Sequence, residues 1–501
     1  MLRGFSTLEI LLALTIMMTT LSAIVLVELG SPNALANGRK EIEAARVAST
    51  ILDSAFAIGL SNFAAIGSLA STTIDNSTVS LSVKNLPDGF TKYLTSTAEW
   101  VDIEGTARFQ ILHALITDFA DVTQSPCSNV LAGDWTHPHI QTFTFAVGDL
   151  LPTGSSAANP VSVLAVSSST LIAGIGTTTA KSDATLLIFD ISSTTRPIYL
   201  SSVDNATSTK QGVSSVALSG NYLYAANANK SNFGTCKQGP ACSQLQIFDI
   251  TNPTAPIDTK NFELSTTSGA FATGSGGQSI GKSIAYANGF IYLGLSKTGS
   301  ASGEEFNIID IHNPRTPIWL GGFPVGRTIN QIVIRGTRAY LATDDSTREL
   351  IVLDIRDPSN ISLVGSYDAP GAPGFGYGND VDVENTTLAL GRTYTPNGPE
   401  VSMLSIASDT PQLLSSETIA STLNPTTVQS VLLRDFLLLV LTNSVLEFFD
   451  IRNPANPIPY GNSLSLPIGS LGTAMACRDN AVYISSVSAN QAGYLTILTG
   501  S

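Results

Sequence analysis

The pattern of hydrophobic and polar positions divides the chain into three parts. From Ile10 to Val27 there are 18 consecutive positions without a charged residue, and most of them are apolar. With its flanks, such a stretch is long enough to cross a bilayer as a helix. Between Gly38 and Phe63, apolar residues recur at helical spacing with charged residues mostly opposite, which predicts an amphipathic helix. Beyond residue 71, short runs alternate between apolar and polar residues, as strands do.

The first of these β runs predict a small sheet followed by a linker. A strand through Trp100 and a strand beginning near Arg108 flank the turn residues 103–105, which predicts a hairpin. Residues 121–139 are polar and rich in turn formers. His137 and His139 lie in this linker, but spacing places no third ligand beside them, so we expect ordinary loop residues rather than a metal site.

The rest of the chain is a repeat. A strand-like line recurs with an aspartate at its end, and in four of five copies an x-x-Pro turn follows. These aspartates are Asp190, Asp249, Asp310, Asp354 and Asp450. A carboxylate at the end of a strand can accept hydrogen bonds from the following turn, so we expect these residues to be structural. A degenerate copy at residues 401–406 and a last copy at residues 494–499 bring the number of units to seven.

Each unit contains about four short strands, which predicts a β-propeller. Units of roughly 45–60 residues have the size of propeller blades, and one blade cannot bury both of its faces alone. We therefore predict a mainly β fold with seven blades, six or eight being the alternatives. The last unit lacks a fourth strand, and the segment near residues 141–147 is expected to supply it.

Both ends of the chain resemble known families. The repeats resemble LVIVD-repeat β-propellers over about residues 140–501. The opening, Gly4-Phe5-Ser6-Thr7-Leu8-Glu9 before an apolar helix, resembles the leader of type IV prepilins and pseudopilins. That resemblance implies that a prepilin peptidase cuts between Gly4 and Phe5 and methylates the new amine. It also implies that Glu9 meets a neighbouring subunit's N-terminal amine in a filament. The alternative is a plain membrane anchor with Glu9 at the interface.

These expectations give a division into six segments, in which a long N-terminal pilin-type helix and a small α+β pilin-like domain precede the propeller. The segments are a leader (1–4), a transmembrane and filament-core helix (5–30), an outer pilin helix (31–70), a small pilin-like β region (71–120), a linker (121–139) and the propeller (140–501). The basic residue in the leader predicts a single-pass precursor in the inner or cytoplasmic membrane with its C-terminus outside. The assembled protein would then belong to a surface pilus or pseudopilus.

The four cysteines fit an exported protein. Cys236 and Cys242 bracket a Gly-Pro turn, and in an oxidising compartment we expect a disulfide between them. Cys127 and Cys477 are a second candidate pair, which requires the two ends of the propeller to meet. The net charge of −14 disfavours binding to nucleic acid, because an acidic surface repels phosphates.

The remaining chemical signals are weak. Residues 276–283 match the phosphate-loop pattern, but the repeat predicts a strand after them where that chemistry needs a helix. The acidic loop 343–346 and the alternating pair Asp380 and Asp382 could hold calcium, although we expect solvated carboxylates there. No serine, histidine and acid arrangement is defensible among four histidines, so we predict no catalytic residues and no cofactor.

The predicted function is that of a minor pilin or filament-tip protein whose extracellular propeller mediates adhesion or recognition. Its expected partners are other pilin subunits, prepilin peptidase, the membrane before assembly, and an unidentified surface ligand or protein. The alternatives are a membrane-tethered exported propeller enzyme, either a hydrolase or a lyase, and a structural subunit of a surface filament.

Overall fold

A computed structural model describes most of the chain beyond residue 31. The residues described are 32–61, 66–74, 77–85, 91–102, 104–117, 127, 131–152, 161–167, 169–176, 184–193, 196–203, 212–227, 243–262, 264, 280–297, 304–372, 374–396, 398–419, 426–467, 469–489 and 493–501. The chain divides into two compact units, Met1–Phe119 and Ala120–Ser501. The predicted leader and membrane segment lie outside the described residues, as do Gly4, Phe5 and Glu9. Cys236 and Cys242 also lie outside them.

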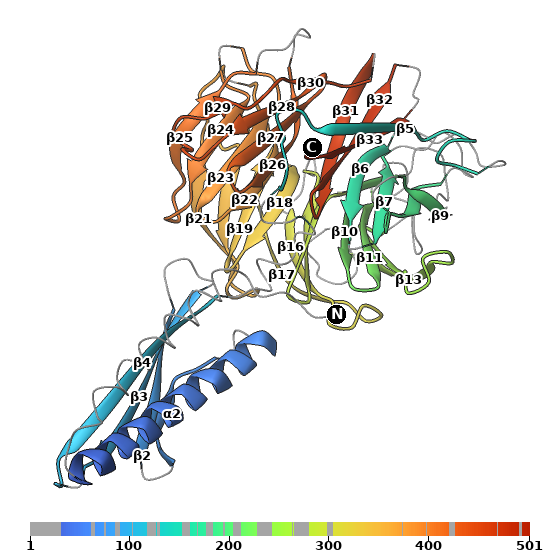
Figure 1. Ribbon diagram of the computed structural model, residues 1–501. Coiled ribbons are helices and arrows are strands. Elements are labelled where there is room, and N and C mark those ends of the chain that lie inside the picture. The colour runs from blue at the N-terminus through green and yellow to red at the C-terminus, as the bar shows by residue number, and fades with distance from the viewer. Residues whose placement is uncertain are drawn as a thin grey trace. The chain divides into compact units, whose positions relative to one another are not determined.

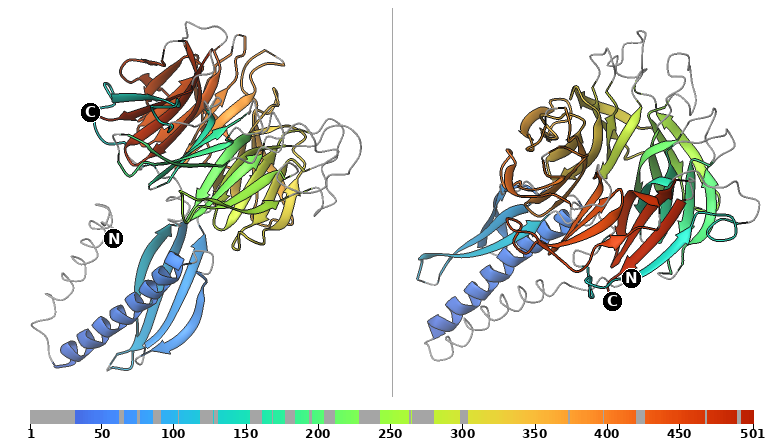
Figure 2. Two further views of the ribbon diagram at one scale, coloured as in Figure 1. Left: turned by 90° about the vertical axis from the view of Figure 1, so that its right-hand side faces the viewer. Right: turned by 90° about the horizontal axis from the view of Figure 1, so that it is seen from above.

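In the first unit a long helix packs on one antiparallel sheet (Figures 1 and 2). Helix α2 is Pro32–Ser61, and the strands, in sheet order, are β1 (Leu69–Ile74), β2 (Ser77–Asn85), β3 (Thr91–Val101) and β4 (Ala107–Thr117). Small and branched side chains of α2, such as Ala44, Val47 and Ala48, pack on sheet residues that include Trp100. Ile42 belongs to the apolar positions at helical spacing that were predicted to be buried, but it is 56% exposed. Ala44 and Val47 face the sheet instead.

The turn between β3 and β4 closes as the sequence predicts. Gly105 has a φ of 81°, a conformation that glycine adopts without steric cost. Asp102 is buried, and its carboxylate accepts the backbone N–H groups of Glu104 at 2.9 Å and Thr106 at 2.8 Å. These bonds lower the pKa of Asp102, with the Arg108 guanidinium adding to the effect.

Within the described residues, the second unit contains seven antiparallel sheets, which makes the protein mainly β. Their strands follow in chain order except in the last sheet, where β5 is the outer strand. The first three sheets are β6 (Val161–Val166), β7 (Thr170–Ile175), β8 (Leu186–Asp190) and β9 (Ile198–Val203); β10 (Val213–Ser219), β11 (Tyr222–Asn227), β12 (Leu245–Asp249) and β13 (Ile257–Phe262); and β14 (Gly281–Ala287), β15 (Phe290–Leu295), β16 (Phe306–Asp310) and β17 (Ile318–Phe323).

The other four sheets repeat this order with small variations. They are β18 (Ile329–Arg335), β19 (Arg338–Thr343), β20 (Leu350–Asp354) and β21 (Ser362–Tyr367); β22 (Gly378–Glu384), β23 (Thr387–Arg392), β24 (Val401–Ser405) and β25 (Gln412–Glu417); β26 (Val428–Arg434), β27 (Leu437–Thr442), β28 (Val445–Asp450), β29 (Ile458–Pro459) and β30 (Leu464–Ser465); and β31 (Ser470–Arg478), β32 (Ala481–Ser488), β33 (Gly493–Thr499) and β5 (His139–Thr144).

The sheets stand around a common centre. The first strand of each sheet contacts the first strands of two neighbouring sheets, in the cyclic order β6, β10, β14, β18, β22, β26, β31 and back to β6. The third strand shows four consecutive buried residues before a half-buried last residue in β8, β12, β16, β20 and β24. Strands buried on both faces are expected when neighbouring sheets cover each side.

One register irregularity recurs between the third and fourth strands. The register shifts by one residue between Ile188 and Phe189 of β8, and the same shift occurs at the same place in the next four sheets. Bulges of this kind increase local twist. Their recurrence shows that the sheets are copies of one structural unit even where the sequence has lost the aspartate.

The N-terminal part of the unit closes the last sheet. Strand β5 pairs antiparallel with β33, with Ile140 opposite Leu498, and Figure 1 shows β5 in teal beside the red C-terminal strands. Trp135, just before β5, is fully buried in a cluster with Leu437 and Phe448. Cys127 forms a disulfide with Cys477 of β31, with the two Cα atoms 5.1 Å apart.

Among the described residues, no helix is both long and apolar enough to cross a bilayer.

Candidate functional site

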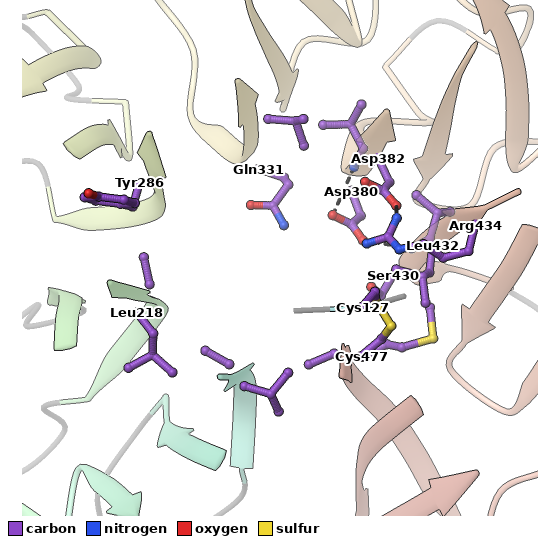
Figure 3. Close-up of a pocket in the computed structure, with 18 of the residues that line it drawn as sticks. Cys127, Leu218, Tyr286, Gln331, Asp380, Asp382, Ser430, Leu432, Arg434 and Cys477 are labelled. Carbon is purple, nitrogen blue, oxygen red and sulfur yellow. Dashed lines mark hydrogen bonds and ion pairs between the residues drawn. A yellow bond between two sulfur atoms is a disulfide. The ribbon is translucent and has the colours of Figure 1, made fainter. Parts of the chain in front are cut away.

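The candidate site is a pocket of about 490 Å³ at the centre of the second unit (Figure 3). All seven first strands contribute to its wall. Small-molecule sites typically enclose roughly 300–1,000 Å³, so the pocket has an ordinary size for a ligand. The Cys127–Cys477 disulfide forms part of the lining.

One wall of the pocket is polar and comes from β18, β22 and β26. Gln331, Asp380, Asp382, Ser430 and Arg434 lie here, and Figure 3 shows them grouped on one side. The alternation of side chains along a strand explains why Asp380 and Asp382 share a face. The facing wall is largely apolar, with Leu218 and Tyr286 labelled on the other side of the close-up.

Asp380 is buried, not solvated as its sequence pattern predicted. The residue is only 6% exposed, because the first strands of the neighbouring sheets enclose it. The two carboxylate oxygens accept the backbone N–H groups of Val381 at 3.0 Å and Val431 at 2.8 Å. Burial raises the pKa of Asp380 to about 6, although hydrogen bonds from Ser430, Val431 and Gln331 act in the opposite direction.

Asp382 occupies the same strand but has a cationic partner. It accepts the backbone N–H groups of Val383 at 2.9 Å and Leu433 at 2.8 Å, and Arg434 Nη1 lies 3.0 Å from Oδ2. The side chains of Arg434 and Asp382 are 12% and 18% exposed. Since the bonds to Val431 and Leu433 both run from β22 to β26, this pair of aspartates also joins two neighbouring sheets.

The repeat aspartates act locally, away from the pocket. Each accepts the backbone N–H of the residue two positions later. The pairs are Asp190 with Ser192 (2.7 Å), Asp249 with Thr251 (2.9 Å), Asp310 with His312 (2.9 Å), Asp354 with Arg356 (3.0 Å) and Asp450 with Arg452 (2.9 Å). These are the Asx-type turns that Asp favours after a strand.

A second side-chain acceptor, not predicted from the sequence, recurs five positions before the last residue of the third strand. Gln244, Glu305, Glu349 and Glu400 precede the third strand, and each side chain accepts a backbone N–H just beyond the fourth strand. All four are buried. Their recurrence at a fixed distance from the strand end was the available signal.

One of these residues belongs to a buried ion pair. Glu349 Oε1 lies 2.8 Å from Arg392 Nη2, and their side chains are 0% and 1% exposed. Arg392 also donates to the carbonyl oxygens of Pro370 and Pro399, each at 2.9 Å. Such a satisfied pair is costly to break, because removing one partner leaves a buried charge. It connects the fourth and fifth sheets in chain order.

The other chemical signals in the sequence have structural explanations. In the acidic loop 343–346, Asp345 is buried with arginines at 3.4 Å (Arg327) and 3.2 Å (Arg348). Lys282, the lysine of the phosphate-loop-like motif, lies in strand β14 and not at a helix start, as the repeat predicts. The described ranges contain no group of three or more His, Cys, Asp or Glu side chains placed to hold a metal ion.

Comparison with known proteins identifies the repeats. The model of the LVIVD repeat matches residues 212–231 and 326–369, so the chain contains LVIVD repeats and is a β-propeller-type repeat protein. No curated protein matches the sequence.

Two solved structures show a distant similarity to this chain. The N-terminal domain of Nup159 has 8% identity and a TM-score of 0.41, with 75% of this chain and 100% of that one covered. Hsv2 of Kluyvelomyces marxianus has 10% identity and a TM-score of 0.36, with 77% and 98% covered.

Proposed function

We propose that this chain is a type IV pilin-like surface protein, a minor pilin or filament-tip subunit, whose propeller recognises a ligand or protein at the cell surface. The observation that carries the proposal is α2 packed along a four-stranded antiparallel sheet, directly after the apolar segment that begins with the Gly4-Phe5 and Glu9 pattern. The helix-on-sheet unit would then be the pilin part, and the second unit the recognition part.

The sheet of the first unit has an apolar face that supports assembly with other subunits. On strand β4, Phe109 is 68% exposed, Leu115 is 55% exposed and Ile111 is 41% exposed. These alternate residues lie on the face opposite the one that packs on α2, because residues two apart share a face. Exposed apolar groups that cluster in this way are typical of interaction surfaces.

We also infer that the second unit is a seven-bladed propeller, with each sheet a blade. The cyclic contacts of the seven first strands and the pairing of β5 with β33 support this count over six or eight. Propellers bind ligands at the central channel or through the loops at its ends. The pocket at the centre supports recognition as the role of the propeller, without catalytic residues or a cofactor.

The experiment that tests the pilin pathway is mass spectrometry of the mature N-terminus in cells that contain a prepilin peptidase. We expect a chain that begins at methylated Phe5, and we expect Gly4→Ala to abolish this processing. A matched Ser6→Ala variant leaves the cleavage pair intact and should be processed normally. A chain that still begins at Met1 in the presence of active peptidase would refute the filament proposal and leave a membrane-anchored propeller.

A further inference from the structure

The central pocket has two chemically different walls. Asp380, Ser430 and Gln331 lie on the polar side. Val166, Leu218 and Ala476 come from β6, β10 and β31 on the apolar side. A ligand that satisfies both walls must carry a polar group at one end and an apolar body at the other. A bare ion or a uniformly polar sugar meets this requirement poorly, since Ser219 and Tyr286 supply the only side-chain hydroxyl groups that strands β6, β10, β14 and β31 bring to this wall among the described residues.

The charge on the polar wall decides the sign of the ligand. Asp382 has Arg434 at 3.0 Å, whereas no ion pair among the described residues includes Asp380. The hydrogen bonds to Asp380 come from neutral donors, namely backbone N–H groups and the side chains of Ser430 and Gln331. A buried carboxylate is stabilised most by a nearby cation. An anionic ligand would instead add a second negative charge beside Asp380.

The polar wall is better suited to an organic cation than to a metal ion. Hard metal ions need several oxygen ligands, and the described residues place no group of three candidate ligands together. Both carboxylate oxygens of Asp380 already accept backbone N–H groups, which leaves them able to attract a cation but poorly placed to wrap one. An ammonium group suits this setting, because it carries its own donors and makes directional hydrogen bonds.

We propose that the central pocket binds a small organic ammonium ion, with its charged group beside Asp380 and Ser430 and its apolar stem against Leu218 and Ala476. The proposal rests on the recognition role of the propeller proposed above and names the class of ligand for it.

The first test compares a charged probe with its neutral analogue. Pentylamine is protonated at about pH 7.5, since alkyl amines titrate near the ordinary lysine value of about 10.4. Binding of pentylamine and of pentanol to the full-length protein in detergent would be measured by calorimetry and by protein-observed NMR. We expect pentylamine to bind at least about tenfold more tightly than pentanol. Equal affinities would overturn the proposal, because the carboxylate would then contribute nothing.

The second test changes the carboxylate without changing its shape. Asp380→Asn should weaken pentylamine binding by about tenfold or more and leave pentanol binding unchanged. Glu400→Gln is the matched control. Glu400 is 4% exposed, against 6% for Asp380, and also accepts a backbone N–H, but it does not line the pocket. If the two variants bind pentylamine with the affinity of the unchanged protein, the proposal fails.

A third variant tests the apolar wall independently of the aspartate. Leu218→Lys places a tethered ammonium group on the wall across from Asp380, where it should compete with the free amine and abolish its binding. Leu218→Met keeps the apolar character and should bind pentylamine normally. Undiminished binding by folded Leu218→Lys would show that the amine binds elsewhere.

These results separate the ligand class from the wider proposal. If the chain is processed at Phe5 and attaches to surfaces but does not bind pentylamine, only the ammonium proposal is wrong. If pentylamine binds in the pocket of a chain that is never processed, the ammonium proposal is supported and the proposed filament role is wrong.

Discussion

At the scale of single residues, each repeat is stabilised by a turn whose hydrogen bonds lie within that repeat. The aspartate at the end of the third strand accepts an N–H two residues later, within the same turn. In the first three copies, the side-chain and backbone bonds from Ser192, Thr251 and His312 hold the pKa of Asp190, Asp249 and Asp310 below its usual range. Such groups stabilise the fold above their ordinary pKa, and that stabilisation is lost as the pH falls through the lowered value.

Asp354 offers the clearest test of this turn. Its carboxylate accepts the N–H of Arg356 at 3.0 Å and pairs with Arg338 at 3.0 Å. We expect Asp354→Ala to lower the free energy of unfolding by about 1–2 kcal/mol, the usual cost of removing such a side-chain acceptor. Asp354→Asn keeps the acceptor and loses the charge, so it should cost less in chemical denaturation. Equal losses would show that the ion pair, not the turn, is responsible.

At the scale of strands, neighbouring sheets are joined by side chains that reach across to backbone groups. Asp380 and Asp382 of β22 accept N–H groups of Val431 and Leu433 on β26. Asn330 donates to the carbonyl of Gly378 at 2.7 Å, which joins β18 to β22 in a similar way. The first strands are therefore connected around the centre by hydrogen bonds as well as by apolar packing.

Asp380, which links β22 to β26, should make the free energy of unfolding depend on pH. The pKa of Asp380 is about 6 in the folded protein, above the ordinary value of 3.8, so the folded state holds the proton more tightly. The contribution of Asp380 to the free energy of unfolding is therefore largest at acidic pH and is lost as the pH rises through about 6. Relative to Asp380→Asn, the unchanged protein should lose about 3 kcal/mol of unfolding free energy between about pH 4 and 7, at about 1.4 kcal/mol per unit. Denaturation curves measure this difference, and parallel pH profiles would contradict the assignment.

At the scale of the whole second unit, closure depends on contacts between distant parts of the sequence. Strand β5 pairs with β33, and Asp134 and Ser501 exchange backbone hydrogen bonds at 2.9 and 3.1 Å. The Cys127–Cys477 disulfide spans 350 residues of sequence and covalently joins the same two regions. A ring of sheets without such closure would leave two open edges.

Removing this disulfide should therefore weaken the ring markedly. For the Cys127→Ala/Cys477→Ala double variant we expect a loss of about 2–5 kcal/mol, because a long loop is released in the unfolded chain. The double variant Cys236→Ala/Cys242→Ala is the matched control, since their predicted pairing closes a much shorter segment and should cost less. Thermal and chemical denaturation under oxidising conditions compare the two. A larger loss in the control would mean that the short loop is the more important constraint.

The parts of the fold that could be predicted from the sequence are those set by neighbouring residues. The repeat aspartates and the β3–β4 turn depend on residues within a few positions, so their spacing is visible in the sequence. The burial of Asp380 depends on Val431 and Ser430, some fifty positions away, and no local pattern shows it. The buried Arg392–Glu349 pair joins different sheets for the same reason. The Cys127–Cys477 pairing was visible only as a consequence of ring closure.

The pairing of β5 with β33 also sets an order in time. The ribosome makes β5 first among the strands of this unit and its partner last. While the strands between them are being made, β5 remains without its neighbour, and the ring stays open until β33 has emerged. Any folding factor that meets the growing chain between these two events would thus encounter an unpaired strand. The ring becomes resistant to strand addition at this edge only once β33 has paired with β5.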